Sequence, residues 1–348
     1  MWRKNLILLV ASSILSVLAL ELGIRLLAPA DYRHQRYWRS CQVFGLLPGA
    51  LSYDPRLGFF HNPNLDLRFK NAEFDTRVRT NSRGFRDDEE SLAEPRVLFL
   101  GDSFCFGWGV DQEETCENVF QERSGYGSLN MGVAGYSTVQ EDILYKGFCE
   151  TFDIRNATVV LLAFSDDPVG NSAAFRTHPR LRKNGAVISF ASPAEESLYL
   201  DFIESQRKPW LRRLSRFSCL GDFAIQLFYR PENRMKPFMD FPGKGKPQQG
   251  GMPVPPFESF EYVLREMISF SDLRSNRLIV ALVPRLEDLL DRPNEEYRAI
   301  EAILSRMNVS WVRLADSLNS DDYYPLDRHW NANGHRAVAE AIHRFLKP

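Results

Sequence analysis

A run of apolar residues that stops abruptly at a polar tripeptide constrains the fold of this chain most. Residues 97–100 read Val-Leu-Phe-Leu and are followed at once by Gly101, Asp102 and Ser103. Four successive apolar residues bounded by glycine are typical of a strand buried on both faces. Because open α/β sheets bind ligands beyond the carboxyl ends of their strands, Ser103 is a candidate nucleophile. The structural alternative is that Asp102 or Ser103 only caps the next element.

Similar apolar runs predict the other strands of the same sheet. The predicted strands are 97–100, 129–133, 158–164, 278–283 and 311–314. Helical stretches separate most of them, and the runs are apolar throughout, so helices should cover both faces of the sheet. We therefore expect an α/β protein, a three-layer α/β/α sandwich with a mostly parallel five-stranded sheet.

A second polar segment lies near the end of the chain, where Asp327 and His329 are two residues apart. In an extended loop such residues point to the same side and can face one another. A serine hydroxyl needs this pair, a histidine to take its proton and a carboxylate to orient the histidine. Two alternatives stay open: Asp327 caps the following helix, or Asp327, His329 and His335 bind a metal ion.

These segments, with what lies between them, resemble the SGNH (GDSL-type) hydrolase family. Residues 101–103 (Gly-Asp-Ser) are similar to its first block and residues 129–137 to its second. Residues 327–329 (Asp-Arg-His), followed by Trp-Asn and Gly-His, resemble the last block of membrane-anchored bacterial members. The widely known members have Asp-x-x-His instead. The resemblance runs from about residue 81 to the C-terminus and implies the flavodoxin-like SGNH hydrolase fold.

The resemblance also implies roles for particular residues. Ser103 would be the nucleophile, His329 the base and then the acid, and Asp327 the residue that orients His329. The backbone N–H groups of Ser103 and Gly135 would hold the oxyanion. The resemblance implies no cofactor and no metal ion.

The third block departs from the family pattern. The family has Gly-x-Asn-Asp, whose asparagine donates to the oxyanion, whereas residues 161–171 here align Asp166 with that asparagine. An ionised carboxylate would repel the developing charge, and losing one oxyanion donor costs about 10²- to 10³-fold in rate. Three compensations are open: Asp166 is protonated, Asn171 supplies the donor, or the N–H groups of Ser103 and Gly135 suffice.

The N-terminus has the composition of a membrane or export signal. Residues 1–4 are basic, and residues 6–20 are apolar or small up to Glu21. This segment is either an uncleaved signal anchor or a signal peptide cut after residues 28–30 (Ala-Pro-Ala). The anchor is favoured because Glu21 and Arg25 separate the apolar run from that cleavage site. In both cases the catalytic domain should lie outside the cytoplasm, periplasmic or extracellular.

The chain is predicted to have three parts. These are the anchor or signal at 1–30, a β-rich preface packed on the core at 31–95, and the hydrolase-like domain at 96–348 with an insertion at about 172–256. In the preface, residues 65–69 and 74–78 alternate with period two and predict a β-hairpin. Four aromatic residues of the insertion should line a substrate pocket or pack in the core. They are Trp210, Phe217, Phe228 and Tyr229.

Composition excludes some classes of partner. The formal net charge of -2 provides no general attraction to nucleic acid. Five cysteines are an odd number for an exported chain, so at least one should be free or pair between molecules. The oligomeric state is not determined by the sequence.

The predicted function is that of a serine esterase. Through the resemblance we expect it to hydrolyse or transfer an acyl group, an acetyl group being the expected one, on a carbohydrate or lipid of the cell envelope. Its partners would be a small-molecule or glycan ester and, through the N-terminal helix, the membrane. The alternative is a catalytically impaired protein of the same fold, an envelope scaffold or glycan-binding module. Asp166 supports that alternative, whereas the intact Ser103, Asp327 and His329 argue against it.

Overall fold

The structure is a computed structural model, and it describes residues 2–172, 178–184, 187–191, 196–206, 209–228, 252–290 and 294–347. The chain divides into two compact units. The helical unit consists of Met1–Cys41, Arg207–Pro237 and Pro325–Asp327. The sheet unit consists of Gln42–Gln206, Phe238–Tyr324 and Arg328–Pro348. The division into parts 1–30, 31–95 and 96–348 stays a prediction.

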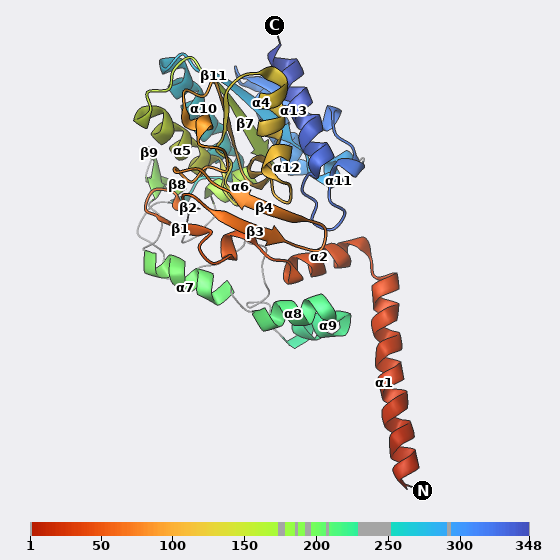
Figure 1. The fold of residues 1–348 in the computed structure, drawn as a ribbon. Helices are drawn as coiled ribbons and strands as arrows, with labels where there is room; N and C mark the ends of the chain where they lie inside the picture. Colours follow the sequence, from red (N-terminus) through yellow and green to blue (C-terminus); the bar gives the residue numbers. More distant parts are fainter. Residues whose placement is uncertain are drawn as a thin grey trace. The chain divides into compact units, whose positions relative to one another are not determined.

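Five parallel strands form the central sheet of the sheet unit (Figure 1). They are β5 (Val97–Gly101), β6 (Ser128–Asn130), β7 (Thr158–Phe164), β11 (Arg277–Val283) and β12 (Ser310–Arg313). They lie in the order β12-β11-β7-β5-β6, and every neighbouring pair is parallel. This order is that of a doubly wound, flavodoxin-like sheet. The predicted α/β class is confirmed, and the sheet is parallel throughout.

β6 ends earlier than predicted, at Asn130. The backbone still follows β5 beyond this point, because the N–H groups of Met131 and Val133 donate to Phe99 and Gly101 at 2.8 and 3.0 Å. The apolar run therefore correctly located the segment, although its second half is a loop that lies along the sheet edge.

Helices cover both faces of the sheet, as the uninterrupted apolar runs predict. On one face α5 (Thr138–Thr151), α10 (Pro256–Leu273) and α12 (Glu295–Arg306) share a core cluster with Leu98 and Leu161. On the other face α4 (Cys116–Ser124) and α13 (Ala332–Leu346) share a second cluster with Phe99 and Leu162. Adjacent residues of one strand thus enter different clusters, and the three-layer architecture is confirmed.

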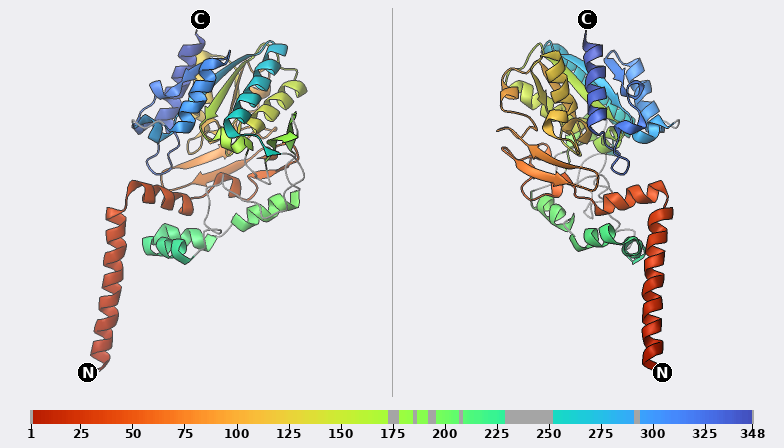
Figure 2. Two further views of the ribbon diagram at one scale, coloured as in Figure 1. Left: turned by 180° about the vertical axis from the view of Figure 1, so that it is seen from behind. Right: turned by 45° about the vertical axis from the view of Figure 1, so that its right-hand side comes forward.

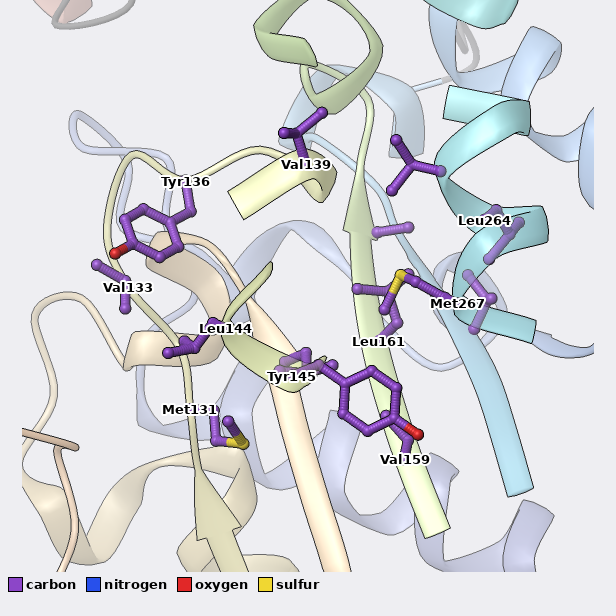
Figure 3. Packing of buried hydrophobic residues seen from close by; sticks show 14 of the residues in the cluster. Met131, Val133, Tyr136, Val139, Leu144, Tyr145, Val159, Leu161, Leu264 and Met267 are labelled. Carbon is purple, nitrogen blue, oxygen red and sulfur yellow. The ribbon is translucent and has the colours of Figure 1, made fainter. Parts of the chain in front are cut away.

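The packing of α10 on β7 shows how one face is filled. In Figure 3, Val159 and Leu161 of the strand point toward Leu264 and Met267 of the helix. All four side chains are buried. Leu264 and Met267 are three residues apart, so they lie on one face of the helix and together cover the strand.

The rest of the sheet unit consists of shorter elements. Its antiparallel pairs are the predicted hairpin β3 (Asp66–Lys70) and β4 (Asp75–Arg79), and also β1 (Leu51–Asp54) with β2 (Gly58–His61). A small antiparallel sheet contains β8 (Arg180–Asn184), β9 (Val187–Ala191) and β10 (Met252–Pro253). The short helices are α3 (Ser103–Phe106), α6 (Asp167–Ser172), α7 (Glu196–Gln206), α11 (Leu286–Leu289), η1 (Phe44–Leu46), η2 (Glu90–Leu92), η3 (Gln112–Glu114), η5 (Leu314–Asp316) and η6 (Ser320–Asp322).

The helical unit contains α1 (Trp2–Leu27), α2 (Ala30–Ser40), α8 (Pro209–Phe217) and α9 (Cys219–Phe228). Figure 2 shows α8 and α9 beside α2 and the C-terminal end of α1. Among the described residues, α1 is the one helix that is long and apolar enough to cross a membrane. It could act as an anchor or as a signal sequence.

Two side chains of the predicted insertion are not where core packing would place them. Trp210 is 60% exposed and Phe217 is 71% exposed, so the expectation of core packing is wrong for both. The Phe228 side chain and Tyr229 lie outside the described residues. All five cysteines lie within the described chain, and each is buried and free.

Candidate active site

The turn after β5 places Ser103 at the carboxyl edge of the sheet. A Cβ atom at Gly101 would lie 2.7 Å from Cys105 Cβ and 3.1 Å from Leu162 Cβ, so a larger residue does not fit there. Asp102 then caps α3, its carboxylate accepting from the Phe104 N–H at 2.9 Å. The sequence analysis gave helix capping by Asp102 or Ser103 as the alternative to a catalytic role. Capping does occur at Asp102, and α3 therefore begins at Ser103.

The structure brings Ser103 and His329 together. Ser103 Oγ lies 2.7 Å from His329 Nε2, although the two residues are 226 positions apart in the sequence. This distance is a hydrogen bond between a hydroxyl and an imidazole nitrogen. The imidazole is therefore placed to accept the proton when the serine oxygen attacks a substrate.

Aromatic side chains fix the His329 ring. Trp108 stacks on it, with ring centroids 5.2 Å apart and planes at 23°. Phe104, next to the serine, lies 4.8 Å from it. Such ring contacts restrict the imidazole to few orientations.

The loop that carries His329 is held by backbone bonds. The Tyr324 N–H donates to the His329 carbonyl and the Arg328 N–H to the Tyr324 carbonyl, both at 2.9 Å. Arg328 has a φ of 71°, and its guanidinium forms an ion pair with Glu287 of α11. The ion pair attaches this turn, whose φ at Arg328 lies in the left-handed region, to α11.

Asp327 is buried in the helical unit, where Tyr37 binds it. Tyr37 Oη donates to Asp327 Oδ2 at 2.7 Å. This hydrogen bond fixes the direction of the carboxylate. Nothing in the sequence pointed to Tyr37, because it lies 290 positions away in a helix with no recognisable motif.

The loop after β6 packs directly on the helix that carries Ser103. A Cβ atom at Gly132 would lie 2.3 Å from the Phe106 nitrogen, so only glycine permits this approach. Asn130 closes the loop by accepting from the Gly132 N–H at 3.0 Å. Gly135 follows with a φ of 89°, and the ring of His178 is hydrogen-bonded to its backbone. The second block therefore lies beside α3, with Gly135 in a conformation that favours glycine.

Asp166, in the segment that the resemblance aligns with the third block, has a cation beside it. Asp166 forms an ion pair with Arg285, which follows β11 at the same edge of the sheet. The Arg285 guanidinium also lies over the ring of Phe164, 5.4 Å from its centroid. An arginine just after the carboxyl end of a strand was the available sequence signal, and the sequence analysis missed it.

The Asn171 side chain is buried and accepts a hydrogen bond from the backbone. Its Oδ1 accepts from the Val139 N–H at 2.9 Å, in the first turn of α5. This bond satisfies one of the N–H groups that a helix start leaves without an intrahelical partner. It joins α6 to α5.

Three buried carboxyl groups, those of Asp102, Glu141 and Asp167, act on one another electrostatically. Burial raises the pKa of Asp102 to about 6. Burial, with the charges of neighbouring acids, raises the pKa of Glu141 and Asp167 well above the usual range. Both carboxyl oxygens of Glu141 have no hydrogen-bond partner among the residues that the structure describes. The raised pKa favours the protonated form of Glu141.

His335 has a structural role, as a link between two helices. Its Nδ1 accepts from the Cys116 N–H at 3.1 Å, and burial lowers the pKa of the ring to about 3. Across the described ranges, no group of three or more His, Cys, Asp or Glu side chains could hold a metal ion. His335 thus joins α13 to α4, and its Nδ1 is occupied by a backbone donor.

No protein-family model and no curated protein matches the sequence. Several solved structures of GDSL-type hydrolases and esterases are similar to it. One is a member of the lipolytic protein G-D-S-L family from Veillonella parvula, with 10% identity, TM-score 0.39, and 71% of this chain and 94% of that chain covered. Another is an acetyl xylan esterase from Geobacillus stearothermophilus, with 12% identity, TM-score 0.37, and coverage of 72% and 93%. A third is a carbohydrate esterase family 2 enzyme from Corynascus thermopiles, with 12% identity, TM-score 0.39, and coverage of 72% and 65%.

Proposed function

We propose that this chain is a serine hydrolase that acts on an acyl ester. The observation that carries the proposal is the 2.7 Å contact between Ser103 Oγ and His329 Nε2 at the carboxyl edge of a parallel sheet. A hydroxyl held this way by an imidazole, with Trp108 and Phe104 fixing the ring, is suited to nucleophilic catalysis.

The reaction would proceed through an acyl-enzyme. Ser103 Oγ attacks the ester carbonyl while His329 Nε2 takes its proton, and Asp327 orients the ring and stabilises the imidazolium. The imidazolium then protonates the leaving alcohol, and the C–O ester bond breaks. Water, or a second alcohol, attacks the acyl-enzyme with His329 again as base. Water gives hydrolysis and an alcohol gives acyl transfer.

The oxyanion would be held by backbone donors. We assign this role to the N–H groups of Ser103 and Gly135. Asn171 is less suited to it, because its side chain is buried against the start of α5. Asp166 lacks a donor when ionised, but its ion pair with Arg285 compensates its charge. Where the family pattern has a neutral asparagine side chain, this chain would have an ion pair without net charge, that of Asp166 with Arg285. The sequence analysis did not suggest this compensation.

The substrate would be an ester of the cell envelope. The length and apolar character of α1 support a membrane anchor, which would hold the sheet unit next to the bilayer and outside the cytoplasm. There it would meet acylated, and in particular acetylated, carbohydrates or lipids. We propose no cofactor, since the chemistry requires only the side chains named above.

The test is hydrolysis of p-nitrophenyl acetate and labelling by a fluorophosphonate probe, with the full-length chain in detergent. Ser103→Ala and His329→Ala should each lose activity by 10³-fold or more, about the loss of a triad member. Ser305→Ala, at an exposed serine of α12, is the matched control and should keep full activity. A folded parent chain that neither hydrolyses the ester nor takes the label would favour the scaffold or glycan-binding alternative.

A further inference from the structure

Large apolar side chains are exposed along one side of α8 and on α9. Trp210, Leu214 and Phe217 of α8 are 60%, 41% and 71% exposed, and Phe223 of α9 is 51% exposed. The three residues of α8 are four and then three positions apart, so they form one stripe on the helix. We call these four side chains the α8–α9 face. Monomeric soluble proteins seldom leave such a group in water without a use.

The α8–α9 face is tied to the end of the apolar helix α1. The Glu21 carboxylate accepts from the N–H groups of Cys219 and Leu220 at 2.7 and 3.0 Å, at the start of α9. Arg25 donates to the Phe217 carbonyl at 2.5 Å and to Glu21 at 2.8 Å. Figure 2 shows this junction, with α9 beside the C-terminal end of α1.

The junction lies at the level where the bilayer would end. The apolar residues 6–20 of α1 span about 23 Å at 1.5 Å per residue, and snorkelling of Arg3 and Lys4 at their N-terminal end brings the span close to the roughly 30 Å of a hydrocarbon core. Glu21 is the first acidic residue of the chain. The helices that Glu21 and Arg25 bind are therefore held at the depth of the lipid headgroups.

The basic side chains of α8 fit a position beside lipid headgroups. α8 carries three arginines and no acidic residue, and Arg213 and Arg216 among them are exposed. Arg36 of α2 binds the carbonyls of Ser215 and Arg216 at 2.9 and 3.0 Å, which adds a cation to the same helix end. An amphipathic helix with aromatic residues on one side and arginines beside them is typical of segments that lie in an anionic membrane interface.

We propose that α8 and α9 make a second, interfacial contact with the leaflet in which α1 ends. The α8–α9 face enters the boundary between headgroups and acyl chains, and Arg213 and Arg216 bind anionic phosphate groups. The proposal rests on retention of α1 as an anchor and is independent of the esterase activity. Its consequence is a helical unit, the unit that also holds Asp327 and Tyr37, with two attachments to the bilayer.

The test uses the full-length chain in lipid nanodiscs with a fluorophore on introduced cysteines. Because all five native cysteines are buried, Phe217→Cys and Phe223→Cys can be labelled with bimane selectively, and the unsubstituted chain controls for background. Leu273→Cys, at the 80% exposed end of α10, is the matched control position. Shallow nitroxide lipids should lower the emission at 217 and 223 about twofold and leave that at 273 unchanged, since only an interfacial label meets the quencher.

Equal quenching at all three positions would overturn the proposal, as would loss of the chain from the nanodisc, which would show that α1 is no anchor. The charge contribution has its own variant. In discs with phosphatidylglycerol, Arg213→Glu combined with Arg216→Glu should reduce the quenching at 217, and unchanged quenching would overturn the role of the two arginines. Failure of ester hydrolysis would not affect this readout, which measures only the label's depth.

Discussion

Arg285 forms an ion pair with Asp166 at the edge of the sheet that carries Ser103. The pair belongs to a continuous group of contacts that reaches the ring of His329. The Arg285 guanidinium lies 5.4 Å from the centroid of Phe164, Phe164 lies 4.9 Å from Phe104, and Phe104 lies 4.8 Å from His329. The carboxylate of Asp166 is thus accompanied by a cation.

Removal of the cation should therefore be more harmful than removal of the acid. Arg285→Ala leaves the charge of Asp166 uncompensated and should lower kcat by about 10²-fold, the effect of one charge a few ångströms away at an effective dielectric constant of about 20. Asp166→Asn should keep or raise kcat. The Asp166→Asn/Arg285→Ala double variant should return to the level of Asp166→Asn.

The double variant decides between two roles of Arg285. Activity as low as that of Arg285→Ala alone would show that the guanidinium acts on the oxyanion itself and does not merely neutralise Asp166. Arg265→Ala, which breaks an exposed ion pair with Glu261 on α10, is the matched control and should leave kcat unchanged.

Tyr37 should act as a positioning residue for Asp327. Tyr37→Phe removes the 2.7 Å bond to the carboxylate, and a hydrogen bond to a charged group is worth about 1.5–3 kcal/mol. We expect kcat to fall by about 10- to 10²-fold while KM stays constant, because the imidazolium of the transition state loses part of its support. Steady-state kinetics of the full chain measure both constants.

Tyr32→Phe is the control for Tyr37, since Tyr32 lies on the same helix and donates to the Cys219 carbonyl at 3.3 Å. It should leave kcat unchanged. If Tyr37→Phe unfolds more readily but the folded fraction keeps its full kcat, Tyr37 has only a structural role.

The parts of the fold that the sequence predicted are those where local pattern and burial agree. β7 and the hairpin of β3 and β4 were predictable, the first from a continuous apolar run and the second from alternation. β1 and β2 have four residues each and no clear alternation, so their pairing depends on tertiary contacts that no pattern records.

In the candidate site, too, the residues within local motifs were predicted and those that depend on tertiary contacts were not. Ser103 and His329 were found because each lies in a motif with its own chemistry, and their contact is the one that the motifs predict. Arg285 and Tyr37 were missed because a single arginine or tyrosine has no distinctive neighbours. Their partners lie 119 and 290 positions away, and only the folded chain brings them together.

Gly132 should tolerate no side chain. Gly132→Ala would place a methyl group 2.3 Å from the Phe106 nitrogen and 2.5 Å from the Cys105 carbonyl carbon, where only backbone could move. We expect a loss of about 3 kcal/mol in the free energy of unfolding, at the upper end for overpacking, and lower activity because α3 must shift. Gly127→Ala, with nothing within 4 Å of its added methyl, should change neither property. Urea unfolding and ester hydrolysis measure the two effects, and equal stability of the two variants would contradict the close approach.

Glu141 should make the stability of the chain depend on pH. Because burial raises its pKa well above the ordinary range of a glutamate, the folded chain holds this proton more tightly than the unfolded chain does. Its contribution to stability is therefore complete below pH 4.5, the ordinary pKa of a glutamate, and is lost as the pH rises toward the raised pKa. Glu141→Gln carries no charge at any pH, so it should match the parent near pH 4.5 and become more stable above it, by up to about 1.4 kcal/mol per pH unit. Urea unfolding at pH 4.5, 6 and 7.5 tests this, with the exposed Glu150→Gln of the same helix as the control. A difference between Glu141→Gln and the parent that stays constant across this range would show that Glu141 is ionised in the folded chain.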